Sequence, residues 1–333
     1  MTILVTGGAG YVGSHVAAEL LAAGYSVIIA DNYSNSSRDV PSAVARAAGS
    51  DVIGIEVDLT NQNALNDVFK NRQIDAVIHC AGSKAVGESV EKPVMYYRNN
   101  IAGTLNLLDA MKSNGTGRLI FSSSATVYGT PRSLPLTEDM AAWPCTNPYG
   151  TTKLVIEKLI EDAAAAYPLS AVLLRYFNPA GAHRSGLLGE SPSGIPNNLM
   201  PYITGVAVGK LERLTVYGGD WPTRDGTGVR DYIHVTDLAL GHLAALEYCF
   251  GHTGVESFNL GRGCGCSVLE LISAFERVNG VKIPYTVARR RDGDVAESYA
   301  GVEKAARELG WSARLSIDDM CRDTWKYITA RGS

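Results

Sequence analysis

The stretch that decides the fold is Thr6-Gly7-Gly8-Ala9-Gly10-Tyr11-Val12-Gly13, close to the N-terminus. It follows the β-branched run 3–6 and opens a helical pattern that continues to about Ala23. Glycines at positions 7, 10 and 13 let the backbone approach an anion, because a side chain there would hold it away. A helix N-terminus offers that anion unpaired N–H groups and a partial positive charge. The stretch therefore predicts a strand–loop–helix unit that binds the diphosphate of a dinucleotide.

Apolar strands and helices alternate on the C-terminal side of this unit. Strands that are apolar throughout are expected at 26–30, 52–57, 76–79 and 118–121, with helices near 61–71 and 101–112 between them. Such strands are typical of a parallel sheet covered by helices on both faces. We therefore predict an α/β fold with a Rossmann-type doubly wound sheet over residues 1–178.

The pattern becomes less regular after about residue 178. Glycine, proline and asparagine interrupt residues 183–201, and short strands at 215–217 and 257–260 mix with helices near 268–279 and 317–331. We expect residues 179–333 to form a smaller mixed α/β domain that binds the substrate, and a segment near 215–250 to return to the first domain.

Composition excludes several classes of protein. Of 333 residues, 46% are hydrophobic and 19% charged, which argues against disorder, and a net charge of −4 gives no footprint for nucleic acid or an anionic membrane. No apolar run reaches the roughly 18–20 residues of a membrane span, and the first residues lack the features of a signal peptide. The six cysteines are scattered, and Cys264 and Cys266 lack a second pair, so neither disulfides nor a metal site is expected. We expect a cytoplasmic protein.

Two acidic residues end the second and third strands. Asp31, followed by Asn32, can accept hydrogen bonds from both ribose hydroxyls and would repel a 2′-phosphate, which favours NAD over NADP. Asp58, followed by Leu59, could contact the adenine ring. An ordinary turn residue is the alternative for Asp31, and a helix N-cap is the alternative for Asp58.

A tyrosine and a lysine four residues apart, Tyr149 and Lys153, begin a helix that runs to about Ala166. This spacing places both on one helix face. A nearby ammonium and a positively charged nicotinamide ring would lower the tyrosine pKa, and a drop of about three units corresponds to roughly 4 kcal/mol. Such a tyrosine could take a proton from a sugar hydroxyl while hydride leaves the same carbon. Ser124 ends the fifth strand, at the edge where such sheets hold their active sites, and could hydrogen-bond the reacting oxygen.

Long segments together carry a family resemblance. They are TGGAGYVGSH, AGSKAVGESVEKP, FSSSATVYG, NPYGTTK, LRYFNPAGAH, GIPNNLMPY, DGTGVRDYIHV and RRRDGD. From residue 2 to at least Lys326 the chain resembles the extended short-chain dehydrogenase/reductase family, and within it the 4-epimerases of UDP-glucose and UDP-galactose.

The resemblance implies inversion at C4′ of a UDP-hexose through a transient 4-keto sugar. Tyr149 would remove the O4′ proton, and NAD would take the C4′ hydride and return it to the opposite face. Ser124 would assist by hydrogen bonding, and Lys153 would bind the nicotinamide ribose and tune Tyr149. The resemblance also implies a homodimer that packs helices near 89–112 and 149–167.

The resemblance extends to two sets of binding residues. The cofactor set comprises Gly7, Gly10, Tyr11, Val12, Gly13, Asp31, Asn32, Asp58, Leu59, Ala81, Gly82, Lys84, Asn99, Ser122, Tyr149, Lys153 and Tyr176. The substrate set comprises Lys84, Ser124, Tyr149, Asn178, Asn198, Leu199, Arg230, Arg291, Asp294 and Ser298. Arg230 and Arg291 would clamp the diphosphate. The alternative for these arginines is surface ion pairing with Asp231 and Asp292.

One position departs from relatives that accept only unsubstituted hexoses. Those relatives carry a bulky tyrosine four residues after the aspartate of the Arg-Arg-x-Gly-Asp segment, where this chain has Ser298. A small residue would leave room for a 2′-acetamido group, so we expect UDP-GlcNAc and UDP-GalNAc to be accepted as well. A shift of one residue would place Tyr299 there and reverse this expectation.

Three alternative functions stay open from the sequence. A sugar-nucleotide 4,6-dehydratase carries an Asp-Glu pair just after the strand-5 serine, and a UDP-glucuronate decarboxylase carries a glutamate there. This chain has Ala125 and Thr126 instead. A non-catalytic NAD-sensing protein tends to lose the tyrosine that this chain keeps. The sequence leaves open the physiological UDP-hexose and the pathway.

Overall fold

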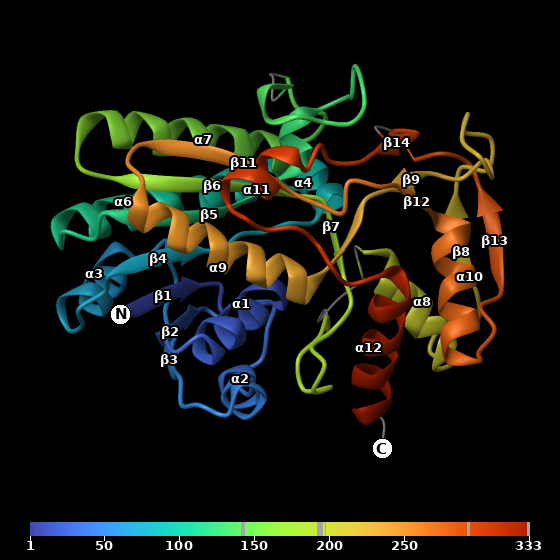
Figure 1. The fold of residues 1–333 in the computed structure, drawn as a ribbon, viewed down its shortest axis with the longest axis horizontal. Coiled ribbons are helices and arrows are strands. Elements are labelled where there is room, and N and C mark those ends of the chain that lie inside the picture. The colour runs from blue at the N-terminus through green and yellow to red at the C-terminus, as the bar shows by residue number, and fades with distance from the viewer. Residues whose placement is uncertain (141–143, 192–195, 197, 292–293, 332–333) are drawn as a thin grey trace.

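The computed structural model describes residues 1–140, 144–191, 196, 198–291 and 294–331. A seven-stranded sheet dominates it, with strand order β11-β6-β5-β4-β1-β2-β3 and every pair parallel (Figure 1). The strands are β1 (Thr2–Thr6), β2 (Ser26–Asp31), β3 (Ile53–Glu56), β4 (Ala76–His79), β5 (Arg118–Ser124), β6 (Ser170–Tyr176) and β11 (Val255–Leu260). The doubly wound α/β fold expected from the sequence is confirmed.

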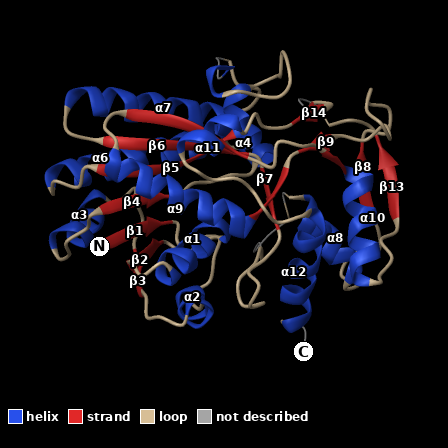
Figure 2. Ribbon diagram, in the orientation of Figure 1, coloured by secondary structure: helices blue, strands red, loops and turns tan. Residues whose placement is uncertain are grey.

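Helices cover both faces of this sheet (Figure 2). One hydrophobic cluster holds α1 (Tyr11–Ala22), α2 (Val40–Ala48) and α9 (Val235–Gly251) against the first face. Another holds α3 (Gln62–Lys70), α6 (Gly103–Ser113) and α7 (Pro148–Ala166) against the second. In β1, Ile3 and Val5 belong to the first cluster and Leu4 to the second, because successive side chains of a strand point to opposite faces. This double burial explains why the central strands are apolar throughout.

Short strand pairs and three helices form the smaller part of the molecule, at the right of Figure 1. β7 (Asn178–Ala180) pairs with β10 (Tyr232–His234), and β8 (Leu214–Tyr217) pairs with β13 (Tyr285–Ala288). β9 (Val229–Arg230) lies between β12 (Cys266–Ser267) and β14 (Glu297–Ser298). A third hydrophobic cluster joins α8 (Leu199–Ala207), α10 (Val268–Asn279) and α12 (Ile317–Ala330).

The remaining helices are short. α4 (Val86–Glu91), α5 (Pro93–Tyr96) and a π-helix (Tyr97–Ala102) lead into α6, so this helical region begins earlier than the sequence suggested. The 3₁₀ turns Ala125–Tyr128 and Glu138–Met140 follow β5, and α11 (Glu303–Glu308) lies by β11. None of the helices in the described ranges is long and apolar enough to cross a bilayer.

The segment that returns to the large sheet overlaps the expected one only in part. The expectation was a return near 215–250, with 257–260 in the smaller part. Helix α9, which lies within the expected range, packs on the large sheet, but β8 pairs with β13 in the smaller part, and β11 pairs with β6 from Val255 to Leu260. The sequence misled because β11 is an edge strand with polar residues such as Glu256, and so lacks the apolar run of the central strands.

Candidate functional site

A cavity of about 1880 Å³ lies at the carboxyl ends of the central strands. Gly7 follows β1, and Asp31, His79, Ser124 and Tyr176 end β2, β4, β5 and β6; all five line it. Sites for one small ligand typically occupy about 300–1,000 Å³. The cavity therefore has room for a dinucleotide and a second ligand together.

The glycine loop forms part of the wall of this cavity. A Cβ on Gly7 would lie 2.6 Å from the backbone of Ala81, and one on Gly13 would lie 2.3 Å from the Gly7 oxygen. Gly10 is the N-cap of α1, and no side chain caps this helix. The first N–H groups of α1 are thus left for an anion, while Gly7 and Gly13 allow the close backbone packing that the loop requires.

Asp31 links the glycine loop to the loop that follows β2. Its Oδ2 accepts a hydrogen bond from Ala9 N (3.0 Å), and its Oδ1 accepts from Tyr33 N (2.8 Å) and Ser36 Oγ (3.0 Å). Both carboxylate oxygens are thus fixed at the cavity wall, where they can meet ribose hydroxyls.

Asp58 lies beside this region and lines the cavity with Asn32 and Leu59. Asn32 Nδ2 donates to Asp58 Oδ2 (3.0 Å). Burial raises the pKa of Asp58, but hydrogen bonds from Thr60 and Asn32 outweigh it and hold the pKa below its ordinary value. The alternative role of Asp58 as a helix N-cap is wrong, because Asn61 caps α3 through its side chain.

Helix α7 presents the tyrosine and the lysine to the same cavity. Asn147 caps α7 by accepting from Gly150 N (2.9 Å), and Tyr149, Lys153 and Ser124 all line the cavity. Lys153 Nζ donates to the Ser122 carbonyl (2.7 Å) and lies 5.9 Å from the centre of the Tyr149 ring. Ser124 Oγ accepts from Thr126 N (3.2 Å).

Burial dominates the titration of this pair. It raises the pKa of Tyr149 to about 12, although a hydrogen bond with Ser124 opposes the rise, and it lowers the pKa of Lys153 to about 8. The lowering of the tyrosine pKa expected from the sequence depends on a cationic nicotinamide ring beside the phenol and stays a prediction.

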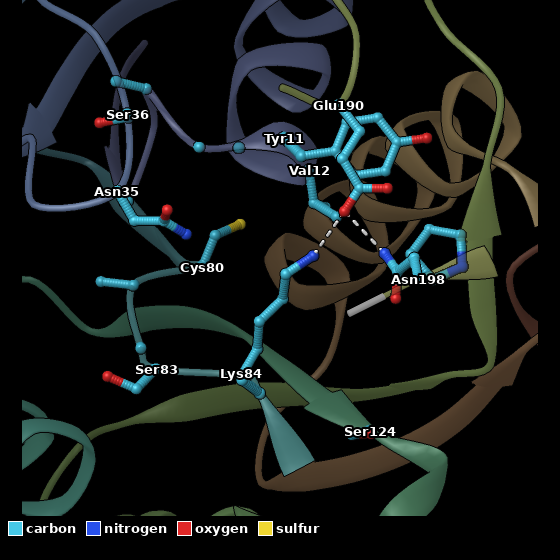
Figure 3. Close-up of a pocket in the computed structure, with 18 of the residues that line it drawn as sticks. Tyr11, Val12, Asn35, Ser36, Cys80, Ser83, Lys84, Ser124, Glu190 and Asn198 are labelled. Carbon is cyan, nitrogen blue, oxygen red and sulfur yellow. Dashed lines mark hydrogen bonds and ion pairs between the residues drawn. The ribbon is translucent and has the colours of Figure 1, made fainter. Parts of the chain in front are cut away.

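Lys84 and Asn198 both contact Glu190 at another part of the cavity wall (Figure 3). Glu190 Oε1 accepts from Lys84 Nζ (3.0 Å) and from Asn198 Nδ2 (2.7 Å), and the glutamate side chain is 12% exposed. The sequence reasoning missed Glu190, which lies between two of the segments that carry the resemblance and has no motif of its own. Its carboxylate joins two residues predicted to hold ligand, one from each part of the molecule.

The cavity is also lined by Asn178, Arg230, Asp294 and Ser298. Arg230 Nη2 forms an ion pair with Asp294 and donates to the Val295 carbonyl (2.9 Å). The alternative pairing of Arg230 with Asp231 is wrong, because Asp231 is buried and accepts from the backbone of Arg262, Gly263 and Ala300.

Three of the predicted site residues do not line the cavity. Ser122 is fully buried beneath the wall, and Leu199 opens α8. Arg291 lies with its guanidinium 3.9 Å from the centre of the Tyr217 ring and is not among the lining residues. Its expected alternative partner, Asp292, lies outside the described residues.

The other predicted residues all line the cavity, including Tyr11, Val12, Ala81, Gly82, Asn99 and Tyr176. Within the part of the chain that the structure describes, no group of His, Cys, Asp and Glu side chains could hold a metal ion.

Comparisons with known proteins agree with this geometry. Residues 4–324 match the family described as GDP-mannose 4,6 dehydratase. The chain is 54% identical over 328 residues to UDP-glucose 4-epimerase of Bacillus subtilis, and the match covers 98% of this chain and 96% of that protein. It is 53% identical over 332 residues to UDP-glucose 4-epimerase of Mus musculus, and that match covers 98% of this chain and 96% of the mouse protein. A crystal structure of UDP-glucose 4-epimerase from Bifidobacterium longum, in complex with NAD+ and UDP, matches with a TM-score of 0.96 and 52% identity, covering 100% of this chain and 99% of that one. The chain belongs to the UDP-glucose 4-epimerases, within the extended short-chain dehydrogenase/reductase family.

Proposed function

We propose that the chain interconverts UDP-galactose and UDP-glucose by inverting C4′ of the hexose, with NAD as its resident cofactor. The observation that carries this proposal is that one cavity is lined both by the uncapped N-terminus of α1 and by Tyr149, Lys153 and Ser124. Relatives of the same name at more than half identity support it.

The residues present fit a dinucleotide. The free N–H groups of α1 suit its diphosphate, and the fixed carboxylate of Asp31 suits ribose hydroxyls and disfavours a 2′-phosphate. Lys153 lines the cavity and would bind the nicotinamide ribose. When bound, NAD accepts the C4′ hydride and returns it.

Tyr149 is the proposed base. Tyr149 has a pKa that burial raises to about 12, and a cationic ring beside its phenol would lower that pKa. Tyr149 then takes the O4′ proton and later returns it, while Ser124 hydrogen-bonds the same oxygen. The UDP moiety is held by Lys84, Asn178, Asn198, Arg230 and Asp294. The sugar stays free to present either of its faces to the nicotinamide.

Elimination and decarboxylation are less well supported. A 4,6-dehydratase needs a further acid and base, yet the residues after Ser124 are Ala125 and Thr126, and both line the cavity. The same stretch lacks the glutamate of the decarboxylases. A non-catalytic NAD-sensing protein has no need of Tyr149, Lys153 and Ser124 together at a cavity wall.

The decisive experiment incubates the purified protein with UDP-galactose and no added NAD. UDP-glucose should form without net NADH. Tyr149→Phe should lose at least about 10²-fold in kcat, as expected for removal of a general base, and should still carry NAD. An active Tyr149→Phe variant would refute the assigned base, and an inactive wild type with NAD bound would refute the function.

We propose that N-acetylated UDP-hexoses are also accepted. Ser298 lines the cavity, whereas Tyr299 does not, and the Tyr299 carbonyl accepts from Leu136 N (2.9 Å). This supports Ser298, and not Tyr299, as the residue at the position where relatives specific for unsubstituted hexoses carry a tyrosine. Ser298→Tyr should abolish UDP-GalNAc turnover and keep kcat for UDP-galactose within about threefold, because one bulky side chain fills the space of the acetamido group. Equal losses on both sugars, or wild type without UDP-GalNAc turnover, would contradict the proposal.

We also propose a homodimer. Val90 and Val94, on α4 and α5, are 62% and 65% exposed, and Tyr97 and Leu105 expose apolar surface on the adjoining helices. Clustered exposed apolar residues mark interaction surfaces. The cytoplasmic location expected from the sequence stays a prediction.

A further inference from the structure

A line of hydrogen-bonding side chains runs from the interior of α9 to the cavity wall. His242 Nε2 lies 2.9 Å from Ser122 Oγ, and Ser122 Oγ lies 3.2 Å from Cys80 Sγ. His242 and Ser122 are fully buried. Cys80 lines the cavity, and its sulfur is visible in Figure 3.

The direction of every bond in this line is fixed. His242 Nδ1 lies 2.9 Å from the Leu238 carbonyl, which only accepts, so Nδ1 carries the ring proton. Burial lowers the pKa of His242 to about 4, so the ring is neutral and Nε2 is an acceptor. The Ser122 hydroxyl therefore donates to His242, and the Cys80 thiol donates to Ser122.

Ser122 connects this line to the proposed chemistry. Its carbonyl accepts from Lys153 Nζ (2.7 Å), the one hydrogen bond of that ammonium recorded among the described residues, and Ser124 follows two residues later on β5. The His242 ring also lies 6.1 Å from the ring of Tyr176, which lines the cavity. Nothing in the proposed mechanism uses His242 itself.

We infer that His242 is a positioning residue: it holds the hydroxyl of Ser122, and thereby fixes the Ser122 carbonyl that seats Lys153. The inference rests on the proposed function. The physical ground is that a buried hydroxyl that loses its imidazole acceptor keeps, among the described residues, only the thiol of Cys80 and the phenol of Tyr176 as partners, and turning toward either one shifts the end of β5. A misplacement of about 1 Å can cost as much as about 10²-fold in rate.

The test compares two substitutions at one position. His242→Leu removes the acceptor, whereas His242→Gln keeps an amide oxygen within reach of Ser122. His242→Leu should lower kcat for UDP-galactose by about tenfold or more with KM within about twofold, and His242→Gln should recover most of that loss. Cys249→Ala is the matched control, because Cys249 is also buried on α9 and donates to the Ser170 carbonyl (3.3 Å), away from the cavity. It should lose stability without loss of kcat.

Ser122→Ala covers the case in which His242→Leu does not fold. It removes the donor, keeps the carbonyl, and should lower kcat to a similar extent with NAD still bound. Equal kcat losses in the Leu and Gln variants, or losses no larger than in Cys249→Ala, would overturn the role of His242 and leave the function standing. A wild type that does not interconvert the sugars would overturn the proposed function instead.

Discussion

At the scale of single residues, the buried charge of Lys153 lowers the stability of the folded chain. The side chain is buried, and burial lowers its pKa from an ordinary 10.5 to about 8. The charged form is therefore less stable in the folded chain than in water. We expect a trade-off at this residue between activity and stability, as is common at functional sites.

Lys153→Met should raise the free energy of unfolding by about 1–3 kcal/mol at pH 7 and abolish epimerisation. Between pH 8 and 10.5 the unfolded wild type binds more protons than the folded one at this residue, so the wild type gains stability with rising pH and the advantage of the variant shrinks. Urea unfolding at pH 7 and pH 10 measures both effects. Lys158→Met, on the exposed side of α7, should show neither; a destabilised Lys153→Met would contradict the argument.

The sequence predicted most of the site at this scale because its residues lie in contiguous motifs. The glycine loop, Asp31, Ser124 and Tyr149 are each recognisable from their immediate neighbours. Glu190 was missed because it acquires its partners, Lys84 and Asn198, only through folding. The contribution of burial to the Tyr149 pKa could not be predicted, because the extent of burial is a property of the packed structure, whereas the lowering by a bound nicotinamide ring stays a prediction.

At the scale of elements, α7 is fixed to the sheet by a buried ion pair. Glu157 receives Arg175 Nη2 (2.7 Å) and Nε (3.0 Å) from β6, and Ser123 Oγ from β5 (2.5 Å). The two charged side chains are 3% and 7% exposed. Because Glu157 lies one turn after Lys153, this pair sets the depth at which α7 presents its catalytic face.

Glu157→Gln should lower the free energy of unfolding by about 3 kcal/mol or more, since it leaves the Arg175 charge buried without a partner. Denaturant unfolding checks this. Asp162→Asn makes the same chemical change at an exposed pair of α7, with Lys158 (2.8 Å), and should have little effect. Similar losses in both variants would show that burial is not the cause.

The sequence predicts the central strands of the large sheet correctly but not the placement of its edge strand β11. Central strands such as β1 and β4 were found because both faces are buried and the residues are uniformly apolar. The edge strand β11 was assigned to the wrong part, because its first half is only partly buried and its partner β6 is distant in sequence.

At the scale of the whole molecule, the exposed valines of α4 and α5 should mark where two copies meet. Val94→Glu should convert the dimer to a monomer in light scattering after gel filtration, because a charge in an apolar contact is not solvated. Val287→Glu is the control, since Val287 is similarly exposed (56%) but lies on β13. A wild type that elutes as a monomer, or a dimer unaffected by Val94→Glu, would contradict this interface.

The return of α9 and β11 to the large sheet limits how such a chain can be recombined. The chain leaves the sheet after β6, builds β7 to β10, and comes back to lay β11 along β6. A chimera joined at residue 178 would therefore exchange more than the sugar-binding half: it would also replace the outermost strand and the helix that carries His242. Grafting a new specificity onto this scaffold requires three junctions: one near residue 178 and one on each side of residues 235–260.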